Sequence, residues 1–136
     1  RLLEHKRELL RVSQHEPQQV VVLIVDDDAA ARRSVHRVLE HQGFRVSSVS
    51  GAATAMQELA RHHFDVVVAD LLMPGQSGID LVRALRRDYP RVPVILISGE
   101  EKLGAALAGA EGVRFLAKPF TGEALAGMIT EALETV

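Results

Sequence analysis

Three consecutive carboxylates, Asp26, Asp27 and Asp28, directly follow an apolar run at residues 20–25. Like charges that stand side by side raise one another's pKa and destabilise a fold unless a cation neutralises them. Mg²⁺ is a hard ion that prefers carboxylate and water oxygens and is often completed by a substrate phosphate. The acidic run therefore predicts a Mg²⁺ platform, although aspartates at the end of a strand are also common helix caps.

Other apolar runs in the chain also end in polar groups. Asp70, Ser98 and Lys118 each follow directly on a run of this kind. The carboxyl ends of parallel strands meet at one edge of a sheet, which is where open α/β folds bind ligands. An aspartate beside a metal can attack phosphorus and form an acyl phosphate, while a hydroxyl and an ammonium group neutralise the transferred oxygens. The convergence of these residue types predicts phosphoryl transfer.

Short β-branched runs alternate with longer helical stretches, which is the pattern of βα units around a parallel sheet. With 136 residues, of which 47% are hydrophobic, the chain is long enough for one α/β domain with a sizeable core. We expect strands at residues 20–25, 44–49, 65–69, 94–97 and 113–116. We expect helices at residues 29–42, 52–62, 78–88, 102–108 and 121–133.

The fourth of these helices is expected to be short and mobile. Gly104, Gly109 and Gly112 each weaken a helix by about 1 kcal/mol relative to alanine, so only residues 102–108 suit a helix. The surface formed by the fourth helix, the fifth strand and the fifth helix would then be poorly organised as an interface. Any dimer is expected to depend on the leucines of the N-terminal segment.

Residues 1–19 form a segment of their own before the domain at residues 20–136. Leu2 and Leu3 are repeated as Leu9 and Leu10, a seven-residue spacing that places leucines on one side of a helix. A linker or signalling helix and a frayed amphipathic tail explain this pattern equally well. Because the chain opens on Arg1, we expect it to belong to a longer protein.

Composition excludes several classes of function. The formal net charge of −2 comes with no basic stripe, so direct contact with nucleic acid is not expected. The absence of cysteine excludes disulfides and thiolate metal sites. The longest apolar run is far too short to cross a membrane and no signal-peptide pattern is present, so we expect a cytoplasmic domain.

Four segments in a fixed order resemble the receiver domains of two-component response regulators, the CheY-like family. They are VLIVDDD, DVVVADLLMPGQSGIDL, PVILISG and FLAKPF, and the likeness covers residues 20–136. It implies a flavodoxin-like, doubly wound, five-stranded parallel sheet with the strand order 2-1-3-4-5 and five helices. In this order the first and third strands are neighbours, which brings Asp26 and Asp27 beside Asp70.

The resemblance also implies a role for each matching residue. Asp70 accepts the phosphoryl group, and Lys118 and Ser98 bind phosphoryl oxygens. The ligands of the Mg²⁺ cofactor are Asp26, Asp27, Asp70 and the backbone carbonyl of Leu72.

Ser98 and Phe115 fall on the switch positions of the family. Phe115 lacks the phenol hydroxyl that many members carry, so the switch here is expected to depend on ring packing. Pro119 is expected to follow a cis peptide that aims Lys118. Asp28 matches an acidic position beside the metal pair, and capping of the first helix of the domain explains it at least as well.

The implied function is phosphoacceptance, in which Asp70 takes a phosphoryl group from the phosphohistidine of a cognate histidine kinase or histidine phosphotransfer domain. The isolated domain would be a self-phosphorylating acceptor with slow autodephosphorylation and not an enzyme. Its parent is expected to be a hybrid sensor histidine kinase or a response regulator. Two alternatives stay open: a haloacid-dehalogenase-like phosphatase with Asp26 as nucleophile, and a receiver-like scaffold that docks partners without phosphorylation.

Overall fold

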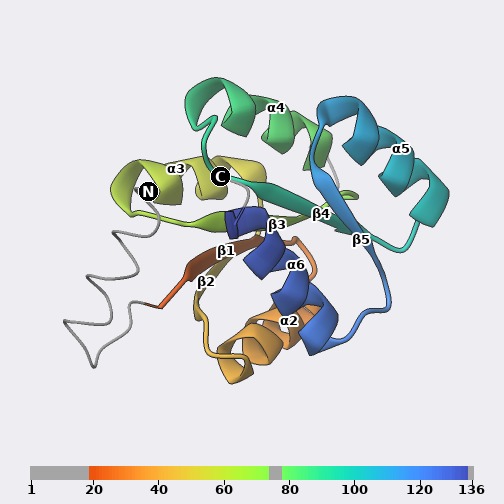
Figure 1. The fold of residues 1–136 in the computed structure, drawn as a ribbon. Coiled ribbons are helices and arrows are strands. Elements are labelled where there is room, and N and C mark those ends of the chain that lie inside the picture. Colours follow the sequence, from red (N-terminus) through yellow and green to blue (C-terminus); the bar gives the residue numbers. More distant parts are fainter. Residues whose placement is uncertain (1–18, 74–77, 135–136) are drawn as a thin grey trace.

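The computed structural model describes residues 19–73 and 78–134, in which strands and helices alternate. The strands are β1 (Val21–Val25), β2 (Arg45–Val49), β3 (Val66–Asp70), β4 (Val94–Ser98) and β5 (Arg114–Ala117). The helices are α2 (Ala29–His41), α3 (Ala52–Arg61), α4 (Gly78–Asp88), α5 (Glu101–Glu111) and α6 (Gly122–Glu134). The strands pair in parallel in the order β2-β1-β3-β4-β5, which confirms the predicted flavodoxin-like sheet (Figure 1).

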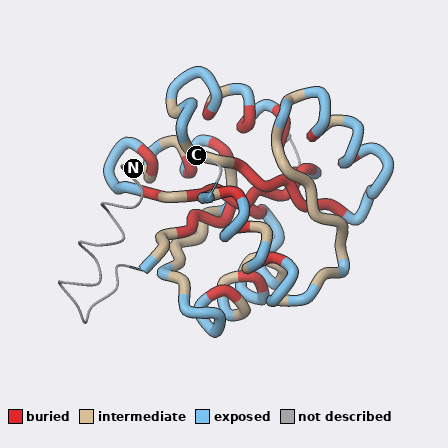
Figure 2. Tube along the Cα trace, in the orientation of Figure 1, coloured by how far each residue is buried: buried red, intermediate tan, exposed pale blue. Residues whose placement is uncertain are grey.

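The central strands of the sheet are buried because helices cover both of its faces. β3 and β4 are buried at every residue, whereas the edge strands β2 and β5 are half-buried or exposed (Figure 2). A strand that is covered on both faces has a continuous apolar sequence and not an alternating one. This explains the runs VVLIV in β1 and VILIS in β4.

Two hydrophobic cores hold the helices against the sheet. Helices α3, α4 and α5 cover one face, and α2 and α6 cover the other (Figure 1). Alternate residues of β1 supply the two cores, with Leu23 and Val25 on the first face and Val22 and Ile24 on the second. Each large side chain buried in this way stabilises the fold by roughly 1.5–3 kcal/mol. The strand ends that carry the candidate residues are therefore fixed in place by packing.

The predicted boundaries agree with the structure for every strand and helix except α5. Each of the other strands and helices begins and ends within one residue of its predicted position. β3 continues through Asp70 and β4 continues through Ser98. The amide of Leu71 donates to the carbonyl of Ile97 at 2.9 Å, so the pairing of β3 with β4 extends past Asp70. Both side chains therefore stand on regular, paired backbone.

Helix α5 is longer than its glycines predict. It spans Glu101–Glu111, so the prediction of a helix limited to residues 102–108 is wrong. Gly112 ends the helix as a C-cap with a left-handed φ of +74°, and its amide donates to the carbonyl of Gly109 at 3.2 Å. Burial of Ala108 and packing of an aromatic ring over Gly104 stabilise the helix interior against the cost of its glycines. Because the short helix was the reason to expect a poorly organised surface beside α5, the structure does not support that expectation.

Residues 1–18 lie outside the described residues, so the linker helix and the leucine-dependent dimer stay predictions. In the part of the chain that is described, no helix is both long and apolar enough to cross a membrane.

Candidate functional site

The three aspartates at residues 26–28 occupy three different environments. Asp26 is fully buried, and its amide donates to the carbonyl of Val49 at 3.1 Å, which continues the pairing of β1 with β2. Asp27 is exposed. Asp28 caps α2, with its Oδ2 accepting the amide of Ala31 at 3.1 Å. The cap explanation therefore holds for Asp28, which leaves Asp26 and Asp27 as candidate ligands for a cation.

Asp70, at the end of β3, lies beside the lysine that follows β5. The Nζ atom of Lys118 is 3.3 Å from Asp70 Oδ2 and 4.0 Å from Asp26 Oδ2. The amide of Leu72 donates to Asp70 Oδ1 at 3.1 Å, so each oxygen of this carboxylate has a donor. Asp70 itself is only 8% exposed. One ammonium group thus stands between two carboxylates that come from the neighbouring strands β1 and β3.

Ser98 links the ends of β4 and β5 to the start of α5. It is 1% exposed, and its Oγ accepts the amide of Glu100, the N-cap residue of α5, at 2.9 Å. Its carbonyl accepts the amide of Lys118, also at 2.9 Å. The peptide between Lys118 and Pro119 is cis, as the resemblance implies. The residues that carry the hydroxyl and the ammonium group, Ser98 and Lys118, are therefore joined by a backbone hydrogen bond.

One oxygen of Asp26 lacks a hydrogen-bond partner. Oδ1 accepts the amide of Asp28 at 3.0 Å, but no donor among the described residues reaches the buried Oδ2. Burial raises the pKa of Asp26, and the charges of Asp70 and Asp27 raise it further, while the Asp28 amide and Lys118 lower it. A buried carboxylate with a free oxygen is costly unless a cation or donor satisfies it. The chemistry of this oxygen fits a divalent cation.

The donor set at this edge fits Mg²⁺ in particular. The described residues contain no group of three acidic, histidine or cysteine side chains arranged as a ready metal site. Mg²⁺ commonly binds through one or two carboxylates, keeps several waters and takes further oxygens from a phosphate. Asp26 and Asp70 supply two carboxylates, and the exposed residues Asp27 and Leu72 follow the same two strands.

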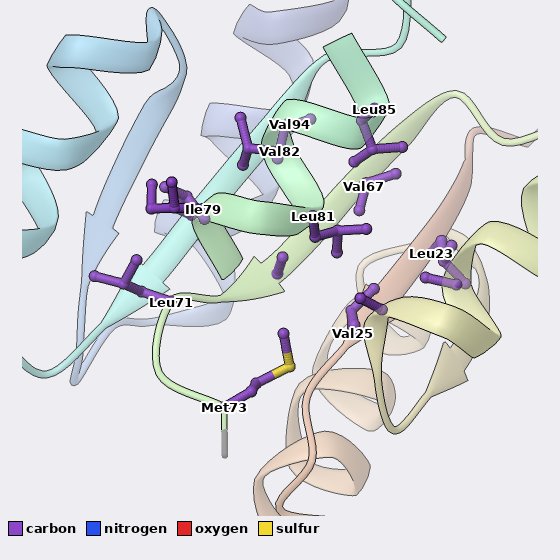
Figure 3. Packing of buried hydrophobic residues seen from close by; sticks show 14 of the residues in the cluster. Leu23, Val25, Val67, Leu71, Met73, Ile79, Leu81, Val82, Leu85 and Val94 are labelled. Carbon is purple, nitrogen blue, oxygen red and sulfur yellow. The ribbon is translucent and has the colours of Figure 1, made fainter. Parts of the chain in front are cut away.

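The loop after Asp70 depends on a glycine that sequence reasoning does not single out. Gly78 begins α4, and its amide donates to the carbonyl of Leu71 at 2.8 Å. A Cβ atom on Gly78 would lie 2.6 Å from the carbonyl oxygen of Asp70. Leu71 and Met73 anchor this loop in the core shown in Figure 3, whereas Leu72 between them is 52% exposed. The available signal is a glycine at the first position of a helix, where helix formation alone does not call for one.

Arg32 is a second residue that supports the site and that the sequence does not single out. Its Nη1 donates to the backbone carbonyl of Asp26 at 2.8 Å and so ties the turn after β1 to α2. In the sequence it is one of two adjacent arginines, and nothing distinguishes it from Arg33.

Comparison with known proteins decides the family of this chain. A family model described as the response regulator receiver domain matches residues 22–130. The chain belongs to the response regulator receiver family. This receiver is 37% identical over 112 residues to the chemotaxis protein CheY of Pseudomonas aeruginosa, with 77% of this chain and 89% of that protein covered. It is 32% identical over 106 residues to the two-component response regulator PhoP of the same species, covering 75% of this chain and 46% of that protein.

Two solved structures share the fold of the receiver. A sensor protein from Polaromonas has a TM-score of 0.80 at 28% identity, with 87% of this chain and 98% of that chain covered. A response regulator receiver domain protein from Clostridium thermocellum has a TM-score of 0.79 at 28% identity, covering 85% and 95%. The receiver thus spans most of CheY but less than half of PhoP.

Family membership confirms the predicted class of function. Receivers accept a phosphoryl group in two-component signalling, generally with Mg²⁺, and interact with histidine kinases or phosphotransfer proteins. The haloacid-dehalogenase-like alternative does not agree with the family match, and its nucleophile would be the fully buried Asp26.

Proposed function

We propose that Asp70 accepts a phosphoryl group from the phosphohistidine of a histidine kinase or a histidine phosphotransfer domain. The observation that carries this assignment is the 3.3 Å contact between Asp70 Oδ2 and Lys118 Nζ at the carboxyl edge of the sheet. A carboxylate oxygen of Asp70 attacks phosphorus and forms the new O–P bond. The P–N bond of the donor breaks, and its electron pair stays on the imidazole nitrogen. The product is an aspartyl phosphate.

Lys118 and Ser98 are assigned to the oxygens of the phosphoryl group. The Lys118 ammonium already lies within 4.0 Å of two carboxylates, so its positive charge is placed where the transferred oxygens arrive. Ser98 Oγ accepts a hydrogen bond from the Glu100 amide, which leaves its own hydroxyl proton available for donation. Positioning and charge neutralisation are the main requirements of this reaction.

Asp26, Asp27, Asp70 and the backbone carbonyl of Leu72 are the groups that would hold Mg²⁺. When bound, the ion neutralises charge that develops on the phosphoryl oxygens. The free, buried Oδ2 of Asp26 supports this assignment.

The isolated domain acts as a switch and not as a turnover enzyme. Phosphorylation shifts an existing equilibrium between two arrangements through Ser98 and Phe115. These two side chains share one face of the sheet, since Ser98 pairs with Ala117 and Phe115 precedes Ala117 by two residues. If Ser98 Oγ turns toward a phosphoryl oxygen, the Glu100 amide at the start of α5 loses its acceptor. The signal therefore leaves the site through α5 and β5.

Labelling with a small phosphodonor tests the acceptor. With Mg²⁺ and acetyl phosphate, the chain should gain one alkali-labile phosphoryl group, detected by intact-mass spectrometry. Asp70→Asn should abolish this gain, and Asp88→Asn, which changes an exposed aspartate at the end of α4, should retain it. Chelation of Mg²⁺ should slow labelling, and Asp27→Ala should lower the affinity for Mg²⁺.

Two outcomes would contradict the assignment. Undiminished labelling of Asp70→Asn would place the acceptor at another residue. No labelling of the parent chain by acetyl phosphate or by a phosphohistidine donor would favour the scaffold without phosphorylation.

A further inference from the structure

The ring of Phe115 packs against a helix position that has no side chain. This position is Gly104, which is buried in α5. A Cβ atom on Gly104 would lie 2.5 Å from Cζ of the ring and 3.0 Å from Cδ1, and closer still to Cε1. Gly104 thus leaves open a slot for the ring of Phe115, which we call the Gly104 slot. Any other residue at this position would have to displace the ring or the helix.

A second glycine of α5, Gly109, serves as a control that distinguishes the effect of this contact from the effect of helix propensity. Gly109 also lies inside the helix, but among the described residues no atom comes within 4 Å of the place of its Cβ. Glycine at either position costs helix stability relative to alanine. Of these two glycines, only Gly104 has a tertiary contact that requires glycine, and this contact involves the switch position Phe115.

Hydrogen bonds connect the Gly104 slot to the hydroxyl assigned to the phosphoryl group. Ser98 Oγ accepts the amide of Glu100 at 2.9 Å, and the carbonyl of Glu100 accepts the amide of Gly104 at 2.8 Å. Rotation of the Ser98 hydroxyl toward a phosphoryl group would remove the partner of the Glu100 amide. The first turn of α5, to which Gly104 is bonded, would loosen as a result. Phe115 is half-buried and packs against the core on this face of the sheet, so a displaced ring would rearrange contacts between β5 and α5.

We propose that Gly104 is a positioning residue that seats the Phe115 ring while Ser98 Oγ accepts the Glu100 amide, and that a side chain at this position shifts the domain toward its phosphorylated arrangement. This inference rests on the proposed function, because it concerns the regulation of the same site. A methyl group on Gly104 raises the free energy of the arrangement in which the ring is seated. The arrangement with the ring displaced is not affected, so the equilibrium moves toward it.

Binding of a phosphoryl mimic measures this shift. The full chain is titrated with beryllofluoride in the presence of Mg²⁺, and the affinity is determined by calorimetry. Gly104→Ala should bind the mimic about fivefold more tightly than the parent, or tighter still, as the usual cost of overpacking converts to affinity. Gly109→Ala should match the parent. Without the mimic, the Phe115 ring resonances of Gly104→Ala should move toward their positions in the mimic-bound parent, which a merely structural role of Gly104 would not cause.

A shortened side chain at Phe115 completes the test. Phe115→Leu removes the collision, so adding Gly104→Ala to this variant should leave its affinity for the mimic unchanged. If Gly104→Ala alone does not fold, Phe115→Leu tests the inference by itself. Removing the ring from the slot should also tighten binding of the mimic. Equal or weaker binding would overturn the inference.

The outcomes distinguish the inference from the function on which it rests. If the parent binds the mimic and Gly104→Ala binds equally well or more weakly, the inference is overturned and the proposed function stands. If the parent neither binds the mimic nor takes up a phosphoryl group, the proposed function fails and the inference fails with it.

Discussion

A methyl group added at Gly78 would press on the backbone that carries the proposed acceptor. Its Cβ would lie 2.6 Å from the carbonyl oxygen of Asp70 and 2.9 Å from Cα of Leu71, and no side-chain rotation can move these main-chain atoms. Ordinary contact begins at 3.4 Å, so α4 and the end of β3 would have to separate by about 0.8 Å. Overpacking of this kind costs about 1–3 kcal/mol. A gain of up to about 1 kcal/mol in helix propensity offsets part of this cost, so we expect a net loss of about 1–2 kcal/mol.

Urea and thermal unfolding of Gly78→Ala, followed by circular dichroism, measure this loss. At roughly 4 °C per kcal/mol for a domain of this size, the Tm should fall by about 4–8 °C. Gly127→Ala in α6 is the matched control, because no atom of the described residues lies within 4 Å of its Cβ position. It should gain about 0.5–1 kcal/mol. If Gly78→Ala is as stable as the parent, the close approach of α4 to the acceptor strand does not limit this position and the reasoning is wrong.

Two further substitutions test the acidic run. Asp28→Ala should destabilise the domain by about 1 kcal/mol in urea titrations, because it removes the cap on the Ala31 amide, and an unchanged midpoint would contradict this. Without metal, Asp26→Asn should stabilise the domain at neutral pH. Burial raises the pKa of Asp26 above its ordinary value of 3.8. At pH values above 3.8 the folded state therefore still binds a proton that the unfolded chain has lost. The stability of the parent falls as the pH rises above that value. Urea titrations in EDTA should show this fall in the parent relative to Asp26→Asn, and parallel stability curves would count against it.

The residues that come together at the strand ends are the part of the site that could be predicted. In a parallel sheet the strands point the same way, so the groups that follow β1, β3, β4 and β5 must meet at one edge. Asp26, Asp70, Ser98 and Lys118 are all found there. The fold was predictable for a related reason, since fully buried strands and amphipathic helices differ clearly in sequence pattern.

Features that depend on contacts across the fold were not predictable. The glycines of α5 lower local helix propensity, but the ring that packs over Gly104 comes from β5, and this contact has no local signal. Gly78 is required by the backbone of β3 in the same way. The burial of Asp26 also follows from tertiary structure, whereas the cap that Asp28 forms on α2 is a local contact and was among the predicted roles.

The buried oxygen of Asp26 that accepts no hydrogen bond from the described residues lowers the stability of the fold, although its proposed role is to bind the cation that the acceptor needs. The two cores on either side of the sheet stabilise the folded state enough to offset the cost of this buried carboxylate. A smaller residue in place of Leu23 or Ile24, which lie in different cores and carry no group proposed for the reaction, would lower the stability of the domain. Signalling lost through such a change in a cell would then reflect a smaller number of folded molecules and not a slower reaction in each of them.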